Sequence, residues 1–236
     1  SSLAKFENEN IQVGIRHVWA TDIDPDSCKT YERNISRYES EHLGINEKVD
    51  VKLADVNDEE IDLTDSKQFP YVDGLLFGFP CNDFSIVGES KGLSGKFGPL
   101  YKHGISILNR KDKPKWFLAE NVGGLSSANE GKALTQITKE MIEAGYTITA
   151  HKYKFEEYGI PQARHRIIIV GFRNDLNLCF KVPAPSMQLT SVKEALSNIP
   201  TDATHQELTK QSKTVIERLQ HIKPGQNAWN SNLPDH

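Results

Sequence analysis

Apolar and polar positions along the chain fall into short blocks that predict strands separated by helices. Blocks rich in apolar and β-branched residues predict strands at residues 17–24, 49–56, 72–79, 115–121, 146–155 and 166–172. Helical patterns lie between them, at residues 24–43, 100–108 and 131–144. Strands that alternate with helices predict an α/β fold with a mostly parallel sheet.

The pattern changes after residue 172. The segment Val182-Pro183-Ala184-Pro185 interrupts the alternation, and the chain closes on the polar, turn-rich KPGQNAWNSNLPDH. Two further helices are predicted there, at residues 191–197 and 206–220. We therefore expect residues 1–181 to form the core and residues 182–236 to form a connecting segment that leads elsewhere.

The composition narrows the classes of protein to consider. The 236 residues contain 37% hydrophobic and 25% charged residues, which is ordinary for a soluble domain. The longest apolar run, residues 167–170, is far shorter than the ~20 residues that a spanning helix needs. Three cysteines do not make a disulfide scaffold, and no signal-peptide pattern opens the chain, so an intracellular location is expected. The net charge of -4 still allows a local basic face for nucleic acid.

Ligands of open α/β sheets bind at the carboxyl ends of the strands. The side chains that stand at the predicted strand ends are Asp22, Asp55, Cys81 and Glu120. Cys81 follows an apolar strand and a proline in the segment GFPCNDFS. A cysteine in such a place is either a small buried hydrophobe or a nucleophile, and the polar residues after it favour the second interpretation. Cys28 and Cys179 lie in ordinary helix and strand patterns and are expected to be structural.

Two other segments carry candidate chemistry. Glu120 ends an apolar strand in AENVGG. Its side chain is either a solvated strand end or, if it lies beside Cys81, a partly desolvated acid that donates a hydrogen bond. In YGIPQARHRIIIVGFR, the alternation of Gln162, Arg164 and Arg166 predicts one shared face of an extended segment. Paired guanidinium groups suit a phosphate or a carbonyl oxygen, whereas the alternative is a solubility pattern on an edge strand.

Together these segments resemble the DNA (cytosine-5)-methyltransferase family. GFPCNDFSIVG resembles its Pro-Cys loop, AENVGGL its Glu-Asn-Val motif, and QARHR its Gln-x-Arg-x-Arg motif, in the family's order and spacing. FGPLY and RLQHIKPGQNAW extend the resemblance from about residue 10 to the end. The resemblance implies a Rossmann-like methyltransferase core that modifies double-stranded DNA, as in restriction-modification systems.

The resemblance assigns a role to each catalytic candidate. Cys81 would add to carbon 6 of cytosine, Glu120 would support the charge at ring nitrogen 3, and Arg164 and Arg166 would contact the base and a phosphate. Ser85 would lie near the DNA. The sequence does not identify the base that removes the carbon 5 proton. Because none of these atoms is reachable inside a duplex, the target base would be flipped out.

The cofactor that the resemblance implies is S-adenosylmethionine, and no metal is expected. Asp22 would bind the ribose hydroxyls, with Ile23 against the adenine. Asp55 and Val56 would meet the amino edge and ring of the adenine, and Pro80 and Leu100 would line the methionine side. The alternative for both aspartates is helix capping, although Asp24, just ahead of Pro25, is the better capping candidate.

The chain also departs from the family pattern. Nothing in it resembles the family's opening Asp-Leu-Phe-x-Gly-x-Gly-Gly, and Ser1-Ser2-Leu3-Ala4 resembles the helix just after that loop. A target-recognition domain and the closing motif are absent, and Asn82 stands where many members have glutamine. A second chain or segment is therefore expected to supply the recognition domain and closing motif. Three functions stay open: DNA methylation, RNA methylation, and non-catalytic binding of DNA or a partner.

Overall fold

The computed structural model divides the chain into two units, Ser1–Thr190 and Ser191–His236, which are described separately. The residues that it describes are 2–6, 9–13, 15–79, 100–127, 131–186, 188–200, 202–204, 207, 209–229 and 231–234. None of the helices described in these ranges is long and apolar enough to cross a membrane.

The chain begins with two short antiparallel strands, β1 (Ser2–Phe6) and β2 (Glu9–Val13), which pair from Ser2↔Val13 to Phe6↔Glu9. The helix expected at the start of the chain is therefore wrong. The sequence explains the difference, because Ile11 and Val13 alternate with polar residues at the strand period of two rather than at the helical period.

A parallel pair of strands follows, β3 (Trp19–Asp22) and β4 (Asp50–Leu53), in a register that sets Asp22 opposite Leu53. The connection between them is α1 (Pro25–Leu43). Asp24 caps this helix, since its carboxylate accepts a hydrogen bond from the Ser27 amide at 2.6 Å. Gly44 ends the helix in the left-handed conformation, with φ of 69°.

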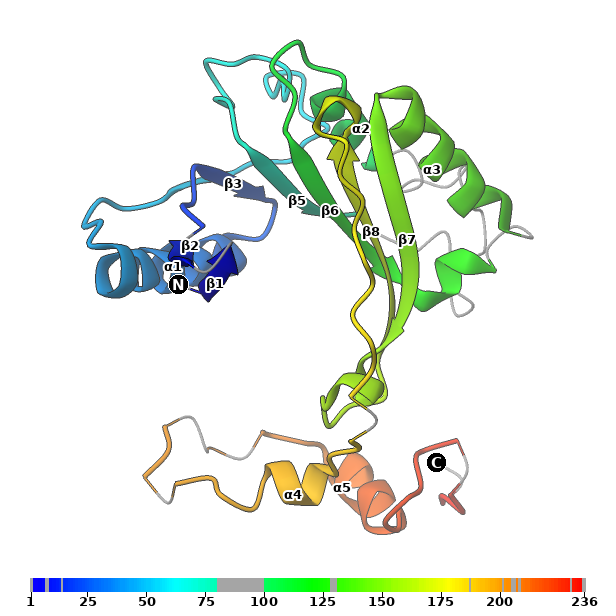
Figure 1. Ribbon diagram of the computed structural model, residues 1–236. Helices are drawn as coiled ribbons and strands as arrows, with labels where there is room; N and C mark the ends of the chain where they lie inside the picture. The colour runs from blue at the N-terminus through cyan, green and yellow to red at the C-terminus, as the bar shows by residue number, and fades with distance from the viewer. Residues whose placement is uncertain are drawn as a thin grey trace. The chain divides into compact units, whose positions relative to one another are not determined.

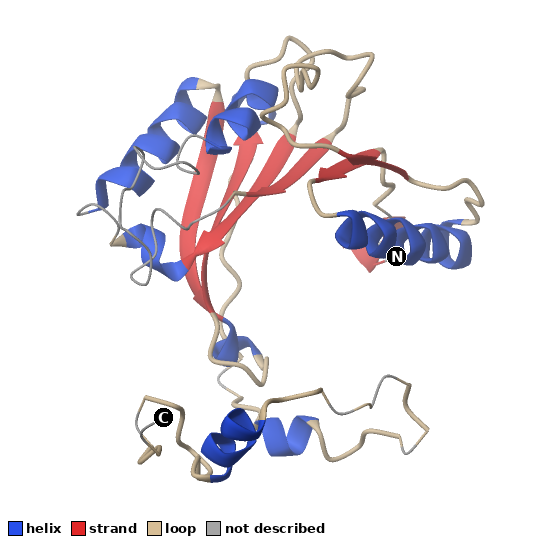
Figure 2. Ribbon diagram, turned by 180° about the vertical axis from the view of Figure 1, so that it is seen from behind, coloured by secondary structure: helices blue, strands red, loops and turns tan. Residues whose placement is uncertain are grey.

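The second sheet has the order β5 (Gly74–Gly78), β6 (Trp116–Val122), β8 (His165–Arg173), β7 (Tyr146–Lys154). β5 and β6 are parallel, whereas β8 is antiparallel to both of its neighbours. The helices α2 (Tyr101–Leu108) and α3 (Lys132–Glu143) lie on the same side of this sheet (Figure 1, Figure 2). The expected α/β class is confirmed, and this sheet is mixed because β8 runs antiparallel to β6 and β7.

The core lies between this sheet and its helices. Along β6, Phe117, Ala119 and Asn121 are buried, and the residues between them are only partly covered. This alternation places the buried set on the face toward α2 and α3, as the pleat requires. The cluster that they join includes Ile167 and Ile169 of β8, Ile105 and Leu108 of α2, and Ile137 and Met141 of α3.

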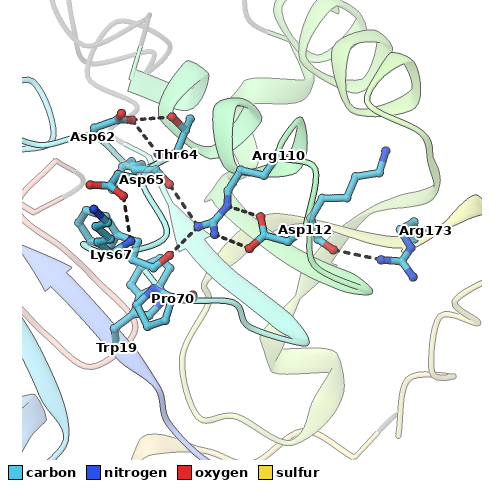
Figure 3. A network of polar contacts seen from close by, with 12 residues as sticks. Trp19, Asp62, Thr64, Asp65, Lys67, Pro70, Arg110, Asp112 and Arg173 are labelled. Carbon is cyan, nitrogen blue, oxygen red and sulfur yellow. Dashed lines mark hydrogen bonds and ion pairs between the residues drawn. The ribbon is translucent and has the colours of Figure 1, made fainter.

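A buried arginine joins this core to the segment that follows β4. Arg110, whose side chain is 4% exposed, forms a bidentate pair with Asp112 at 2.9 and 2.7 Å. Its other nitrogen donates to the carbonyl of Phe69 at 2.7 Å and to that of Leu63 at 3.5 Å (Figure 3). The guanidinium therefore satisfies backbone carbonyls that would otherwise be buried without a partner.

Trp19 of β3 reaches the same segment. Its indole nitrogen donates to the Pro70 carbonyl at 3.0 Å, and its ring packs edge-on against Phe69 at 4.9 Å between centroids. These contacts connect β3 to the segment that Arg110 holds. Short 3-10 helices at Gly123–Ser126, Phe155–Tyr158 and Asn174–Leu176 complete this unit.

The unit Ser191–His236 contains α4 (Val192–Ala195) and α5 (Lys213–Gln220), capped by Ser191 and Ser212. None of its described residues is buried. The helix predicted from residue 206 begins only at Lys213, because the Ser212 hydroxyl accepts from the Val215 amide at 3.3 Å and fixes the helix start there. The predicted helix at 191–197 is likewise shortened to α4.

Candidate functional site at the strand ends

The carboxyl ends of β5 and β6 lie side by side, because the parallel register sets Gly78 opposite Glu120. A Cβ atom built on Gly78 would lie 3.6 Å from Glu120 Oε2, so the carboxylate stands against the end of β5. The chain continues from β5 toward Pro80, Cys81 and Ser85, which lie outside the described residues. The structure therefore places the predicted acid beside the strand that leads to the predicted nucleophile.

Glu120 is held by an arginine of the neighbouring strand. Its Oε1 accepts from Arg166 Nε at 2.7 Å, and the side chains are 40% and 18% exposed. Arg166 also donates to the carbonyl of His165 at 2.8 Å. Among the described residues Glu120 Oε2 has no partner, so this oxygen is the one available to a ligand. A charge-assisted pair of this kind fixes the orientation of the carboxylate.

Asn121 ties the two strand ends together. Its buried side chain donates through Nδ2 to the carbonyl of Phe79 at 3.2 Å and accepts from the Val122 amide at 2.8 Å. Phe79 is the last described residue before Pro80, so Asn121 fixes the backbone where the nucleophile segment begins. Sequence analysis did not include Asn121 among the site residues. The feature that could have identified Asn121 is a polar side chain at a core-facing position of an apolar strand, because a buried polar group needs a hydrogen-bond partner.

Gln162, Arg164 and Arg166 lie around the start of β8. The chain bends at residues 161–162, where the Gln162 amide donates to the Ile160 carbonyl at 2.8 Å, and β8 begins only at His165. Gln162 and Arg164 line a pocket of about 670 Å³ together with Ile168, whereas Arg166, two residues before Ile168 in β8, pairs with Glu120. Alternate residues of a strand share a face, so this arrangement is compatible with the common face, which stays a prediction for the residues before β8.

That pocket lies on the sheet face away from α2 and α3, because Trp116 and Leu118 line it while Phe117 between them is buried on the opposite face. Its walls are mostly aromatic and aliphatic, with Tyr153 and Phe180 among them. A second hollow, of about 540 Å³, borders the first turns of α1. Neither hollow, as lined by described residues, includes the predicted cofactor aspartates.

A histidine–glutamate pair pins the start of β8. His165 Nε2 lies 2.7 Å from Glu156 Oε1, and this hydrogen bond holds the pKa of Glu156 below its usual value. The Phe155 amide also donates to the Arg164 carbonyl at 3.0 Å. Sequence analysis missed this pair, since the two residues are separated by a turn and show no motif spacing.

The predicted cofactor side is the carboxyl edge of β3 and β4. Asp22 ends β3, and its Oδ1 accepts from the Asp24 amide at 2.8 Å. Asp24 itself is the helix cap, and the hydrogen bonds from the Ser27 backbone and hydroxyl lower the pKa of its carboxyl group. Asp22 is therefore not the cap of α1. Ile23, the predicted adenine contact, is exposed.

Asp55 follows β4 and forms a turn with Asn57. Its Oδ1 accepts from the Asn57 amide at 2.9 Å and from Asn57 Nδ2 at 2.8 Å. Val56 packs partly against the core, and Leu100 immediately precedes α2. The capping alternative for Asp55 also fails among the described residues, since no helix follows it.

The other cysteines differ from each other. Cys28 is buried, and its thiol donates to the Asp22 carbonyl at 3.5 Å, which confirms the structural interpretation. Cys179 is exposed, so its expected place inside a strand is wrong. The reason is that β8 ends at Arg173 and the residues after Leu176 pair with no strand in the described part.

Comparison with known proteins places this geometry in a family. The sequence model described as C-5 cytosine-specific DNA methylase matches residues 4–235. The type II methyltransferase M.BbvI of Brevibacillus brevis is 46% identical over 226 residues, which cover 93% of this chain and 57% of the relative. M.NgoFVII of Neisseria gonorrhoeae is 37% identical over 225 residues, 92% of this chain and 56% of the relative.

A solved structure supports the fold alone. The crystal structure of a mutant of Spodoptera frugiperda DNMT2 superposes with a TM-score of 0.60 at 17% identity, over 87% of this chain and 58% of that one. The chain thus spans little more than half the length of the curated relatives that it matches. Because the family model covers nearly all of it, the chain belongs to the C-5 cytosine-specific DNA methylase family.

Proposed function

We propose that this chain contains the catalytic core of an enzyme that transfers a methyl group from S-adenosylmethionine to carbon 5 of cytosine in double-stranded DNA, as part of a restriction-modification system. The observation that carries the proposal is the strand-end arrangement in a member of this family. Glu120 stands beside the end of β5, Arg166 orients it, and Asn121 holds the backbone that leads to Cys81.

The chemistry follows from those positions. The Cys81 thiolate adds to carbon 6 of a flipped cytosine, which moves electron density onto ring nitrogen 3 and makes carbon 5 nucleophilic. Glu120, protonated on the oxygen that Arg166 leaves free, would donate this proton to ring nitrogen 3 and take it back when the thiolate leaves. After methylation, loss of the carbon 5 proton and elimination of the thiolate restore the aromatic ring and release Cys81.

Residues at the edge of β3 and β4 fit the cofactor. Carboxylates accept hydrogen bonds from hydroxyl and amino groups, and Asp22 and Asp55 follow adjacent parallel strands at one edge. Ile23, Val56, Pro80 and Leu100 would supply apolar contacts. Bound S-adenosylmethionine would provide the activated methyl group, and these residues would orient it toward the ends of β5 and β6.

We also propose that residues 1–181 are the catalytic core, that residues 182–236 connect it to a target-recognition domain, and that a second chain or segment supplies this domain and the closing motif. Supporting this, Pro183, at the start of the connecting segment, lines the apolar pocket on the sheet face away from α2 and α3. Leu76 of β5 is 62% exposed, and no described residue of the C-terminal unit is buried.

The test is methyl transfer from labelled S-adenosylmethionine to duplex DNA and to RNA, with the chain alone and with the region of M.BbvI outside the matched residues. The proposal predicts labelled 5-methylcytosine in DNA when that region is supplied, and none with Cys81→Ser. Preferential methyl transfer to RNA would contradict the assignment of DNA as the substrate. DNA binding without transfer under every condition would favour the non-catalytic alternative.

A further inference from the structure

A hydrogen-bonded relay connects the proposed adenine contact to helix α2. Asp55 Oδ1 accepts from the backbone amide and from Nδ2 of Asn57, at 2.9 and 2.8 Å. The other side-chain atom of Asn57, Oδ1, lies 3.1 Å from Nε2 of His103, on the first turn of α2. Asn57 therefore stands between a carboxylate from the β4 side and a ring from the second sheet's helices.

The chemistry of the amide allows one orientation only. Asp55 offers acceptors, so Asn57 must turn its NH₂ group toward the carboxylate and its carbonyl oxygen toward His103. His103 must then carry a proton on Nε2, since an amide oxygen cannot donate. A reversed amide would set two oxygens against each other at Asp55. His103 thus fixes Asn57, and Asn57 fixes Asp55.

Among the described residues, no hydrogen-bond partner stands at the second carboxylate oxygen of Asp55. Oδ1 is engaged by two donors, so Oδ2 is the oxygen that can accept from a ligand. A carboxylate whose rotation is restricted in this way presents that oxygen in one direction. Such an acceptor distinguishes an amino group, which donates, from a carbonyl group, which does not.

The helix turn that carries His103 is itself held. Glu140 of α3 accepts from Tyr101 Oη at 3.0 Å, from Lys102 Nζ at 2.6 Å and from Gln136 Nε2 at 2.7 Å. Burial opposes the charge on Glu140, but the hydrogen bonds from Lys102, Gln136 and Tyr101 outweigh it and hold its pKa below the usual value. Tyr101 is buried, so His103 extends from an anchored turn.

We propose that Asn57 and His103 are positioning residues for the adenine end of the cofactor, acting through Asp55 to set the preference for a 6-aminopurine. This inference rests on the proposed function, which assigns Asp55 to the adenine. Neither residue is a catalytic residue, because both act through a third side chain. Sequence motifs did not identify them, since the contact joins residues 46 positions apart.

The test measures binding of S-adenosylhomocysteine and of its inosine analogue to the full chain by calorimetry. A net hydrogen bond of about 0.5–1.5 kcal/mol predicts that His103→Ala and Asn57→Ala each weaken binding of the adenine ligand by about 3–10-fold. Binding of the inosine analogue should change little, so the preference for adenine falls. His103→Gln, which keeps a donor, should restore most of it, and the exposed His42→Ala is the matched control.

Asp55→Ala distinguishes a failure of the proposed adenine site from a failure of the positioning role of Asn57 and His103. If Asp55→Ala leaves both affinities unchanged, or the unaltered chain binds neither ligand at millimolar concentration, the proposed adenine site is wrong and the relay falls with it. If Asp55→Ala weakens adenine binding while both relay variants match the unaltered chain, only the relay is wrong. Equal weakening for both ligands would show that His103 and Asn57 merely support the fold, and would also overturn the inference.

Discussion

In the sheet β5-β6-β8-β7, every second residue of β6 is buried on the face toward α2 and α3, whereas no residue of β3 or β4 is buried. Helix α1 has only Cys28 and Glu39 buried. The proposed catalytic strand ends are thus positioned by a continuous core, and the proposed cofactor edge is positioned by a few specific contacts. The core therefore fixes the ends of β5 and β6, where the proposed catalytic residues lie, more firmly than the ends of β3 and β4, where the proposed cofactor residues lie.

The largest expected effect is the difference in stability loss between the same substitution in α2 and in β4. Leu108 of α2 is completely buried, and Leu53 of β4 is 59% exposed. Leu108→Ala should lower the free energy of unfolding by about 4 kcal/mol, because it leaves a cavity in the core. Leu53→Ala should change it by less than about 0.5 kcal/mol. Urea denaturation of both variants measures the contrast, and equal losses would refute it.

The next prediction removes Arg110, which connects the core to the segment that follows β4. Arg110→Ala leaves the Leu63 and Phe69 carbonyls without their charged donor, at a cost of about 3 kcal/mol. Hydrogen exchange should rise more in β3 and β4 than in α3, because the contact holds the segment after β4. Exposed Arg16→Ala is the control. An equal rise in hydrogen exchange in β3, β4 and α3 would contradict a specific role of Arg110 in holding the segment after β4.

A smaller effect is expected at the catalytic edge itself. Asn121→Ala leaves the Phe79 carbonyl unpaired, which should cost about 1–3 kcal/mol in stability. Methyl transfer should fall as well, since the backbone before Cys81 loses its anchor. Asn121→Asp should be similarly impaired, because it keeps an acceptor for Val122 but has no donor for Phe79. Full activity of the aspartate variant would contradict the anchoring role.

The smallest expected effect is the pH dependence of stability that His17, just before β3, contributes. Burial lowers the pKa of His17 from 6.5, against the opposing charges of Glu39 and Asp50. A lowered pKa means that the unfolded chain binds the proton first, so stability is complete above pH 6.5 and falls as the pH drops below it. His17→Gln should therefore lose less stability between about pH 8 and about pH 5 than the unaltered chain. An identical loss would exclude His17 as the cause.

Much of the fold could be predicted from the sequence, because it depends on local patterns. The apolar block of β6 and the Asp24-Pro25 pair at the start of α1 are local signals, so both elements were predicted within a few residues. The N-terminal helix was wrong because it was expected from the resemblance of the first residues to a family element and not from a periodic pattern, and β1 begins at Ser2 instead. The start of α5 failed because only the Ser212 hydrogen bond distinguishes the helix from the residues before it.

The site was predictable where motifs mark strand ends. Glu120 lies opposite the last residue of β5, as its strand-end motif predicts, whereas its role as the acid beside Cys81 stays a prediction. Its ion pair with Arg166 was not predicted, because the pairing of β6 with β8 joins distant segments that neither motif relates to each other. Contacts between distant segments, such as Asn57 with His103, leave no signal in a single sequence.

The central claim is that Cys81 attacks cytosine beside Glu120. The most direct measurement uses duplex DNA containing 5-fluorocytosine, in which fluorine replaces the proton whose loss completes the reaction. With S-adenosylmethionine and the missing M.BbvI region supplied, the account predicts a covalent complex resistant to denaturation, mapped by mass spectrometry to Cys81 and absent in Cys81→Ser. A complex attached at another residue, or methyl transfer that persists in Cys81→Ser, would contradict it.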